Sequence, residues 1–212
     1  MEFLPEDLQH YVEDHSENES DLLKRINRET HLHVLKPRML SGHLQGRVLS
    51  MLSHMVRPST ILEIGTYTGY AALCLAEGLQ QDGKLITIDS NAELAKRTQS
   101  YFDASPYNEQ ISMKVGNAVE VIPTLNQQWD LVFIDADKQN YSTYFDLVIE
   151  DMNEGGIIIA DNVLWSGKIS DPTKNDAATS TLREFNAKVH ADTRVQNVLF
   201  PVRDGLMILR KL

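Results

Sequence analysis

The order of apolar and polar residues divides the chain near Pro58. Before this proline, apolar residues recur at spacings of three and four, which place them on one face of a helix. Two such series are Tyr11, Val12, Leu22, Leu23 and Ile26, and then Leu44, Val48, Leu49 and Leu52. Residues 1–57 carry no strand signal and are predicted to form a helical lead-in.

After Pro58, short β-rich apolar runs alternate with amphipathic segments. Strands are predicted at residues 61–64, 84–88, 111–115, 131–134, 157–160, 195–202 and 206–209. Helices are predicted at residues 70–79, 92–102, 119–125, 144–150 and 182–189. Because β-α alternation with continuous apolar strands is typical of a buried parallel sheet, we expect a doubly wound, Rossmann-like α/β fold.

The C-terminal region departs from this alternation. Residues 166–179 are polar and are predicted to form a loop. Arg203-Asp204-Gly205 separates the last two apolar runs, and Asp-Gly between such runs is typical of a hairpin. The sheet is therefore expected to end with an antiparallel strand, in a single domain that spans residues 1–212.

Composition narrows the classes of function. A formal charge of -10 and a pI near 5.1 disfavour nucleic acid as a partner, since Lys and Arg are dispersed. Cys74 is the only cysteine, which excludes a disulfide framework and a thiolate zinc site. The N-terminal residues lack the basic segment followed by an apolar segment that is typical of a signal peptide. No apolar run approaches the ~18 residues needed to span a bilayer. These features predict a soluble, cytoplasmic protein with no membrane partner.

A glycine-bearing turn follows the first predicted strand. Its residues, Gly65-Thr66-Tyr67-Thr68-Gly69, let backbone N–H groups approach a ligand but lack the G-x-G-x-x-G spacing of a pyrophosphate cradle. Asp89 lies about 20 residues further on, where nucleotide-binding sheets place a carboxylate against ribose hydroxyls. Both features suit a nucleoside without phosphates. The alternative is that the glycines allow tight packing and that Asp89 caps the next helix.

Oxygen donors follow the fourth and fifth predicted strands. They are Asp135, Asp161 and Asn162, and the carboxyl ends of parallel strands meet at one edge of a sheet. Two carboxylates and an amide oxygen form a hard ligand set, which suits Mg²⁺, or else Mn²⁺ or Ca²⁺, better than zinc or copper. Alternatively, Asp161-Asn162 is a turn that begins a loop.

Two further residues lie near these donors in the sequence. Lys138 follows Asp135 by three residues, so its amine can reach the same pocket. A nearby dication would favour the neutral amine and allow Lys138 to act as a base, whereas the alternative is an ordinary surface lysine. Trp165 is predicted to pack, but it follows Asn162 closely enough to line a substrate site.

Three segments together resemble one known family. They are residues 62–70 (LEIGTYTGY), residues 133–138 (FIDADK) with Asn140-Tyr141, and residues 161–167 (DNVLWSG). On these motifs the chain resembles the caffeoyl-CoA and catechol O-methyltransferases, a cation-dependent class that uses S-adenosylmethionine. The resemblance extends from Arg28-Glu29-Thr30 to residues 201–205 (PVRDG).

The resemblance implies a methyltransferase sheet of seven strands with a reversed last strand, usually in a homodimer. It implies that Asp135, Asp161 and Asn162 bind the metal and that Lys138 is the catalytic base. A helical lead-in over residues 1–57 would close over the cofactor and the acceptor.

Cofactor and acceptor contacts are also implied residue by residue. Trp165 and Ser166 would contact the acceptor. The implied cofactor contacts are the closing segment (Met39, Ser41), the methionine site (Glu63, Gly65, Thr66), the ribose and adenine sites (Asp89, Ala118) and four further residues (Tyr67, Ala71, Asp135, Asp137).

Two residues depart from the family pattern. Ala71 stands where a serine commonly contacts the cofactor carboxylate, and Gln45 stands before Gly46 where many plant members carry glutamate. Plant-type acceptor recognition therefore does not transfer to this chain. The expected activity is metal-dependent methyl transfer from S-adenosylmethionine to a hydroxyl of a small catechol-like acceptor. The alternatives are a tRNA 5-hydroxyuridine O-methyltransferase, an NAD-dependent oxidoreductase and a non-catalytic binder of S-adenosylmethionine.

Overall fold

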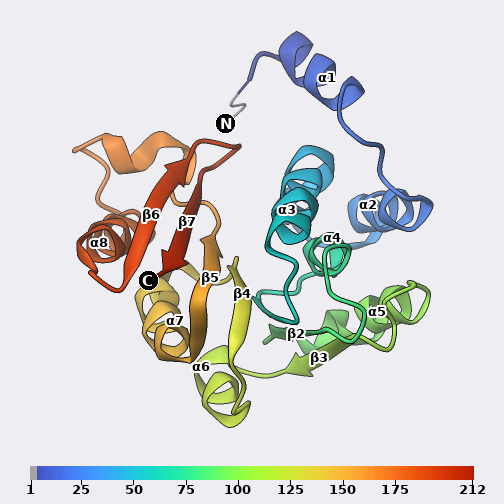
Figure 1. The fold of residues 1–212 in the computed structure, drawn as a ribbon. Helices are drawn as coiled ribbons and strands as arrows, with labels where there is room; N and C mark the ends of the chain where they lie inside the picture. Colours follow the sequence, from blue (N-terminus) through green and yellow to red (C-terminus); the bar gives the residue numbers. More distant parts are fainter. Residues whose placement is uncertain (1–3) are drawn as a thin grey trace.

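A seven-stranded sheet runs through the centre of the protein, with helices on both of its faces (Figure 1). The structure is a computed structural model that describes residues 4–212. The strand order is β3-β2-β1-β4-β5-β7-β6; β1 to β5 are parallel, and β7 is antiparallel to β5 and β6. The predicted fold class, with its antiparallel last strand, is confirmed. The strands are β1 Thr60–Ile64, β2 Lys84–Asp89, β3 Ile111–Val115, β4 Trp129–Ile134, β5 Met152–Ala160, β6 Val195–Phe200 and β7 Leu206–Lys211.

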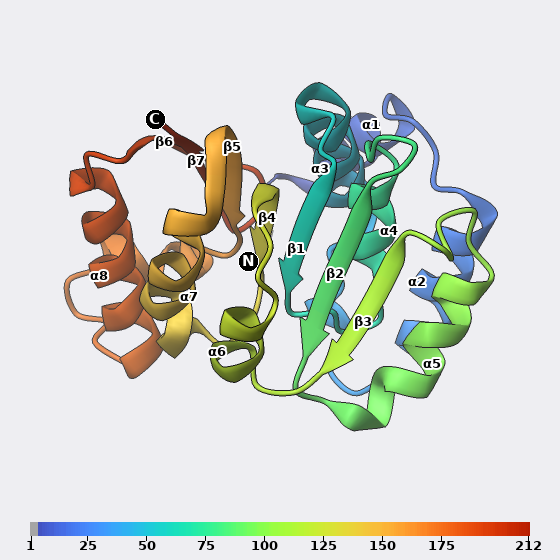
Figure 2. The ribbon, with the colours of Figure 1, turned by 60° about the horizontal axis from the view of Figure 1, so that its bottom comes forward.

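The helices form a layer on each side of the sheet (Figure 2). α6, α7 and α8 bury residues such as Phe145 and Phe185 against one face. α2, α3, α4 and α5 bury residues such as Ile26 and Leu49 against the other. The helices are α1 Glu6–Asp14, α2 Asp21–His33, α3 Gly42–Val56, α4 Tyr70–Ala76, α5 Ala92–Asp103, α6 Ala118–Val121, α7 Tyr141–Val148 and α8 Ala177–Ala191.

The lead-in before Pro58 is helical where the structure describes it, from residue 4 onward. It consists of α1, α2, the short 3-10 turn η1 (Pro37–Met39) and α3. The Ser20 hydroxyl accepts a hydrogen bond from the Leu23 N–H at 3.3 Å and so caps the start of α2. Residues 1–3 of the predicted lead-in lie outside the described residues. Among residues 4–212, no helix has the length and apolar composition needed to cross a bilayer.

Alternation of side chains along β1 decides on which face of the sheet the Glu63 carboxylate lies. Ile61 belongs to the core under α2 to α5, whereas Leu62 and Ile64 belong to the core under α6 to α8. Successive residues of a strand face opposite sides of the sheet, so Glu63 lies on the same side as Ile61. Glu63 is fully buried and pairs in register with Thr87 of β2.

Several element boundaries differ from the prediction. The helix expected to reach residue 125 ends at Val121 and continues as the 3-10 turn η2 (Ile122–Thr124), because Pro123 has no N–H for a helical hydrogen bond. α8 begins at Ala177, inside the predicted loop 166–179, because Asp176 caps it by accepting from the Thr179 N–H at 3.2 Å.

Two further elements begin earlier than predicted. α7 begins at Tyr141 rather than at residue 144, and the 3-10 turn η3 (Lys138–Asn140) leads into it. β5 begins at Met152 rather than at residue 157, because its first residues pair with Trp129 before a register shift. The polar residues after Met152 hide this pairing from a hydrophobic pattern. The short 3-10 turns η4 (Ile149–Asp151) and η5 (Trp165–Ser170) complete the described chain.

Candidate active site

The turn after β1 comes very close to the end of β4. Gly65 has φ +103°, and an added Cβ there would lie 2.0 Å from the carbonyl oxygen of Asp135. The Asp135 N–H donates to the Ile64 carbonyl at 2.9 Å, which ties the two strand ends together. A side chain at position 65 would separate them, so glycine is required by contact as well as by backbone conformation.

Glu63 presents a buried carboxylate with one unused oxygen. Its Oε2 accepts from Thr87 Oγ1 at 2.5 Å, while its Oε1 finds no donor among residues 4–212. Burial raises the pKa of Glu63 well above its ordinary value, and the charges of Asp135 and Asp89 add to the effect. An unpaired oxygen in such a place indicates a missing donor, and a cationic amino group would satisfy it.

Asp89 holds the same turn from the end of β2. Its Oδ2 accepts from the Tyr67 N–H at 2.7 Å, and its Oδ1 accepts from the Asn91 N–H at 2.8 Å. Asn91 caps α5, so Asp89 supports the start of that helix only indirectly. Ala118 begins α6 beyond the next strand end and is buried. Asp89 and Ala118 therefore flank the turn along the edge where β1, β2 and β3 end.

A pocket lies between this turn and the end of the lead-in. Tyr67 Oη donates to the Leu35 carbonyl at 3.2 Å, which fastens the segment before α3 over the turn. Seven of the predicted cofactor residues line the pocket, whereas Glu63, Asp89, Ala118 and Asp137 do not. The lining residues are Met39, Leu40, Ser41, Gly65, Thr66, Tyr67, Thr68, Tyr70, Ala71, Phe133 and Asp135.

Two carboxylates meet where β4 and β5 end. Ile134 and Ala160 are partners in the parallel ladder, so Asp135 and Asp161 leave the sheet side by side, and the Asp161 N–H donates to the Ile134 carbonyl at 2.9 Å. Asp161 is only 2% exposed. Burial, together with the nearby charge of Asp135, raises the pKa of Asp161 to about 7. Such a pair favours a cation between or beside the carboxylates.

Lys138 points into this group of acids. Its Nζ donates to Asp135 Oδ1 at 3.0 Å and to Tyr141 Oη at 2.5 Å, and its side chain is 10% exposed. Tyr141 Oη donates in turn to the Asp161 carbonyl at 2.9 Å. The alternative of an ordinary surface lysine is therefore wrong for Lys138.

The loop after β5 has an unusual backbone. Asn162, Trp165 and Ser166 have φ values of +61°, +48° and +55°. Left-handed backbone at residues other than glycine costs about 1 kcal/mol or more each and is common at functional sites. The Ser166 N–H donates to Asp204 Oδ1 at 2.5 Å, which anchors the loop to the β6–β7 turn. The surrounding contacts thus hold this loop in a strained conformation.

The family model described as O-methyltransferase matches residues 13–212. The chain belongs to the O-methyltransferase family.

Its relatives agree with this assignment and extend it to the cofactor. It is 32% identical to a catechol O-methyltransferase of Niastella koreensis, covering 90% of this chain and 87% of the relative. It is 30% identical to a caffeoyl-CoA O-methyltransferase of Stellaria longipes, covering 98% and 91%. The solved structure of the O-methyltransferase TomG from Streptomyces achromogenes, in complex with SAM, superposes with a TM-score of 0.90 at 26% identity, covering 97% and 96%.

This protein is thus an O-methyltransferase that depends on S-adenosylmethionine, and the resemblance to the caffeoyl-CoA and catechol enzymes is confirmed. The alternative of an NAD-dependent oxidoreductase has no support in these similarities. The roles of individual site residues, the metal and the acceptor stay predictions.

Some predicted residues of the O-methyltransferase also have structural tasks. Asp137 accepts from Tyr144 Oη at 2.5 Å and from Asn140 Nδ2 at 2.6 Å, so both of its oxygens stabilise the start of α7. The Asn162 N–H donates to Asp161 Oδ1 at 2.6 Å. Trp165 Nε1 is buried without a partner among residues 4–212, and Lys138 Nζ lies 6.0 Å from its ring centroid.

The candidate metal site depends on an amide as its third donor. Among residues 4–212, no group of three or more His, Cys, Asp and Glu side chains is arranged to hold a metal ion. The set formed by Asp135, Asp161 and Asn162 has two carboxylates and one amide, so it does not need such a group. Its chemistry suits a hard dication, and the two adjacent carboxylates supply most of the attraction.

Sequence reasoning assigned no site contact to four residues that shape the O-methyltransferase site, although three of them lie in the segments quoted for the family resemblance or its departures. Thr87 bonds to Glu63, Tyr141 bridges Lys138 to the Asp161 backbone, and Gln45 with Arg203 reaches the Asp161 side chain from distant segments. A polar residue inside the apolar run Leu85-Ile86-Thr87-Ile88 was a usable signal. The other contacts have no local signal, because their partners lie far apart in the chain.

Proposed function

We propose that this enzyme transfers the methyl group of S-adenosylmethionine to one hydroxyl of a small catechol-like acceptor, with the help of a divalent cation, Mg²⁺ being favoured. The observation that carries the proposal is the meeting of Asp135, Asp161 and Lys138 beside the cofactor pocket, which Asp135 itself lines. A relative named for catechol supports an acceptor with two neighbouring hydroxyls. A homodimer, as the family resemblance implies, is part of the same proposal.

The residues fit S-adenosylmethionine at its amino group. Glu63 does not itself line the pocket, but hydrogen bonds through Thr87 connect it to Thr66, which does. Its Oε1 is buried without a donor among residues 4–212, and an ammonium group would supply both the missing hydrogen bond and the opposite charge. Ala71 lines the pocket without a hydroxyl, so the cofactor carboxylate must be bound by other groups. Met39 and Ser41 lie in the segment that covers this pocket.

The residues at the ends of β4 and β5 fit a hard dication. Asp161 Oδ1 accepts from the Asn162 N–H and Oδ2 accepts from Gln45 Nε2, which leaves acceptor capacity on each oxygen. Asp135 and Asn162 would complete the ligand set. When bound there, a dication supplies positive charge that lowers the pKa of a nearby acceptor hydroxyl.

Lys138 is the proposed base. Its Nζ donates to Asp135 Oδ1 at 3.0 Å. With a dication held by Asp135 and Asp161, Lys138 would take the acceptor proton at Nζ. Tyr141 Oη keeps the amine in place throughout, because it is anchored to the Asp161 carbonyl.

The transfer step joins an oxygen nucleophile to a sulfonium electrophile. The acceptor oxygen forms a bond to the methyl carbon while the carbon–sulfur bond breaks, and the electron pair of that bond goes to sulfur. The hydroxyl proton goes to Lys138 Nζ. Because opposite charges disappear in this step, alignment of the reactants and exclusion of water account for most of the acceleration. Trp165 and the segment 37–41 would exclude water from the reactants.

A transfer assay tests the proposal. Labelled methyl groups are followed from S-adenosylmethionine into catechols, flavonoids, acyl-CoA esters and bulk tRNA, with Mg²⁺ or with excess EDTA. We expect labelled catechols in the presence of Mg²⁺ only. Full activity in EDTA would contradict the metal requirement, and labelling of tRNA alone would establish the 5-hydroxyuridine alternative.

A further inference from the structure

We propose that Arg203 and Gln45 are positioning residues that couple the cofactor-covering segment, residues 37–41, to the carboxylate of Asp161. This inference rests on the proposed metal site. It predicts that cofactor and metal bind cooperatively and that Arg203 transmits the effect.

A direct contact connects α3 to the metal-ligand candidate. Gln45 Nε2 donates to Asp161 Oδ2 at 2.5 Å, although the two residues are 116 positions apart. Gln45 is 1% exposed and Asp161 is 2% exposed. Inside a protein such a hydrogen bond is poorly replaced by water, so its loss would leave Oδ2 without this donor and free the carboxylate to rotate.

Arg203 determines which way the Gln45 amide faces. Its Nη1 donates to Gln45 Oε1 at 3.0 Å. Arginine has no acceptor, so the amide oxygen must face Arg203 and the NH₂ group must face Asp161. Without Arg203 the amide could turn over and present its oxygen to a carboxylate, which would repel it.

The same arginine atom reaches the cofactor-covering segment. Arg203 Nη1 also donates to the Ser41 carbonyl and lies 3.5 Å from the Leu40 carbonyl. Leu40 and Ser41 line the cofactor pocket. A movement of this segment when cofactor binds would therefore be felt at Nη1, and through Gln45 at Asp161.

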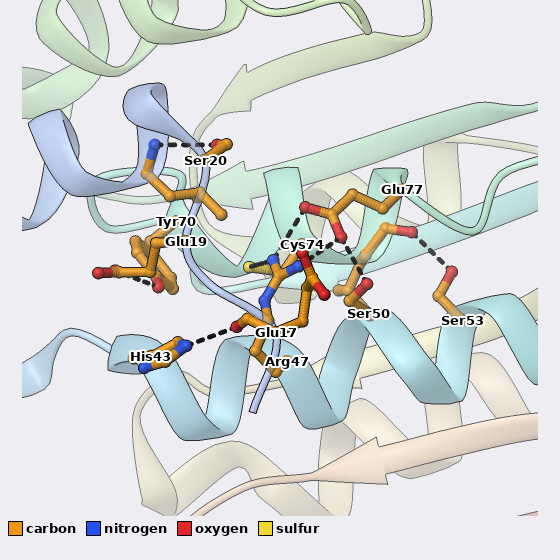
Figure 3. Close-up of polar contacts among 12 residues, drawn as sticks. Glu17, Glu19, Ser20, His43, Arg47, Ser50, Ser53, Tyr70, Cys74 and Glu77 are labelled. Atoms are coloured by element: carbon orange, nitrogen blue, oxygen red, sulfur yellow. Dashed lines mark hydrogen bonds and ion pairs between the residues drawn. The ribbon is translucent and has the colours of Figure 1, made fainter. Parts of the chain in front are cut away.

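The helix that carries Gln45 is held firmly. Arg47 donates to both oxygens of Glu77 at 3.0 and 2.9 Å, and Ser50 Oγ donates to Glu77 Oε2 at 2.5 Å (Figure 3). Gly46 lets α3 approach α4 closely, since an added Cβ would lie 2.7 Å from the Tyr70 ring. Because these contacts hold α3 against α4, we expect movement at the Gln45 side chain and in the segment before the helix.

Arg203 lies in a turn that is hydrogen-bonded to the loop after β5. Its φ is +48°, in the connection between β6 and β7. The neighbouring Asp204 accepts from the Ser166 N–H through its side chain and from the Leu164 N–H through its carbonyl at 2.8 Å. The turn thus contacts the cofactor-covering segment and the loop after β5 directly, and it is connected to Asp161 through Gln45.

The test measures binding rather than turnover. Titration calorimetry with Mn²⁺ gives the metal affinity. Repeating it with S-adenosylhomocysteine, the demethylated cofactor, gives the factor by which this compound changes the metal affinity. In the native enzyme we expect each ligand to tighten the other by the same factor, as linkage requires. Arg203→Met should weaken Mn²⁺ binding about tenfold, as is common for residues that orient a metal ligand, and bring the coupling factor close to one.

Variants separate positioning from structural support. Arg203→Lys keeps a cationic donor and should retain most of the coupling between cofactor and metal. Gln45→Met is similar in size to the native side chain but has no donor. It should weaken Mn²⁺ binding as much as Arg203→Met does. Arg210→Met, an exposed arginine on β7, is the matched control and should change neither value. The electron paramagnetic resonance spectrum of bound Mn²⁺ should broaden in Arg203→Met and return in Arg203→Lys.

The outcomes distinguish this inference from the proposed function. If the native enzyme binds no Mn²⁺, the proposed metal site fails. If it binds Mn²⁺ and Arg203→Met shows the same affinity and the same coupling, the inference is overturned and the function stands. If Gln45→Met does not fold, the Arg203 variants decide. A fall in melting temperature of Arg203→Met with unchanged coupling would show a purely structural role and also overturn the inference.

Discussion

Lys138 donates a hydrogen bond from Nζ to Asp135 Oδ1 at 3.0 Å, so the proposed base and a proposed metal ligand already touch. Only 10% of the lysine side chain is exposed. On its other side, Lys138 Nζ donates to Tyr141 Oη, so the lysine is held between the proposed metal ligand and a buried tyrosine. The contact with Asp135 makes the two proposed roles interdependent.

Replacement of the base should reduce turnover while binding persists. Lys138→Met removes the proton acceptor, and we expect kcat to fall by about 10²- to 10⁴-fold, the usual contribution of a general base. The affinity for S-adenosylmethionine should change little, because Lys138 does not line the cofactor pocket. Steady-state kinetics and calorimetry measure the two values. Lys84→Met is the control, because Lys84 lies at the end of β2 that is remote from Asp89 and the site. An unchanged kcat in Lys138→Met would show that this lysine is not the base.

Loss of a metal ligand should separate catalysis from cofactor binding. Asp161→Asn keeps the size of the side chain but removes its charge, so we expect turnover to disappear and Mn²⁺ binding to weaken by at least about tenfold. Most S-adenosylmethionine binding should remain, because Asp161 does not line the cofactor pocket. Equilibrium dialysis with labelled cofactor measures that binding. The exposed Asp82→Asn variant should behave as native, and normal activity of Asp161→Asn would contradict the metal site.

Cofactor binding should displace a proton from Glu63. Burial raises the pKa of Glu63 well above its ordinary value, and pairing with an ammonium group requires the ionised form. Below that raised pKa, binding must therefore release a proton, and cofactor affinity should increase as the pH rises. Calorimetry in two buffers of different ionisation enthalpy detects the released proton.

The matching substitution is Glu63→Gln. It keeps the shape of the side chain without the charge and should weaken cofactor binding by about 10- to 100-fold, the range expected for a hydrogen bond between charged groups. Proton release should vanish in the same variant. Exposed Glu109→Gln is the control. Equal cofactor affinity in Glu63→Gln and the native enzyme would show that the unpaired Oε1 does not bind the cofactor.

Acid stability should depend on an ion pair before β6. The hydrogen bond from the Arg194 side chain lowers the pKa of Asp192 from its ordinary value of 3.8 to about 2. A lowered pKa stabilises the fold above about pH 4, and that stabilisation is lost as the pH falls from about 4 to about 2. Arg194 is partly exposed, so solvent screening limits the contribution to ~1 kcal/mol or less.

Urea unfolding at several pH values measures this contribution. Asp192→Asn should be less stable than the native enzyme at pH 6, and the difference should shrink toward zero near pH 2. Asp82→Asn should show no such pH dependence. A constant difference between Asp192→Asn and the native enzyme over this range would contradict the ion-pair explanation.

Periodic patterns in the sequence were sufficient for the fold class. Alternating β-rich and amphipathic segments predicted a parallel sheet, and Asp204-Gly205 predicted the final hairpin; both are confirmed. Boundaries were less accurate where pairing, rather than hydrophobicity, decides where an element begins. Met152, for example, starts β5 because it pairs with Trp129.

The sequence predicted the site residues at the strand ends, but it did not predict the hydrogen bonds that connect them to distant segments. Asp135 and Asp161 follow adjacent parallel strands, so topology alone brings them together once the sheet is known. Asp137 has a further role that no local pattern indicated, because its two carboxylate oxygens accept from Tyr144 and Asn140 at the start of α7.

By itself, the sequence determined the elements, the parallel sheet and the strand-end chemistry, because hydrophobic periodicity and turn residues act over a few neighbouring positions. Tertiary structure alone decided that Gln45 meets Asp161, that Arg203 orients Gln45, and that Glu63 keeps an unpaired oxygen. A hydrogen bond requires two atoms to lie within about 3 Å, and for segments far apart in the chain only the packing of the helices on the sheet sets that distance.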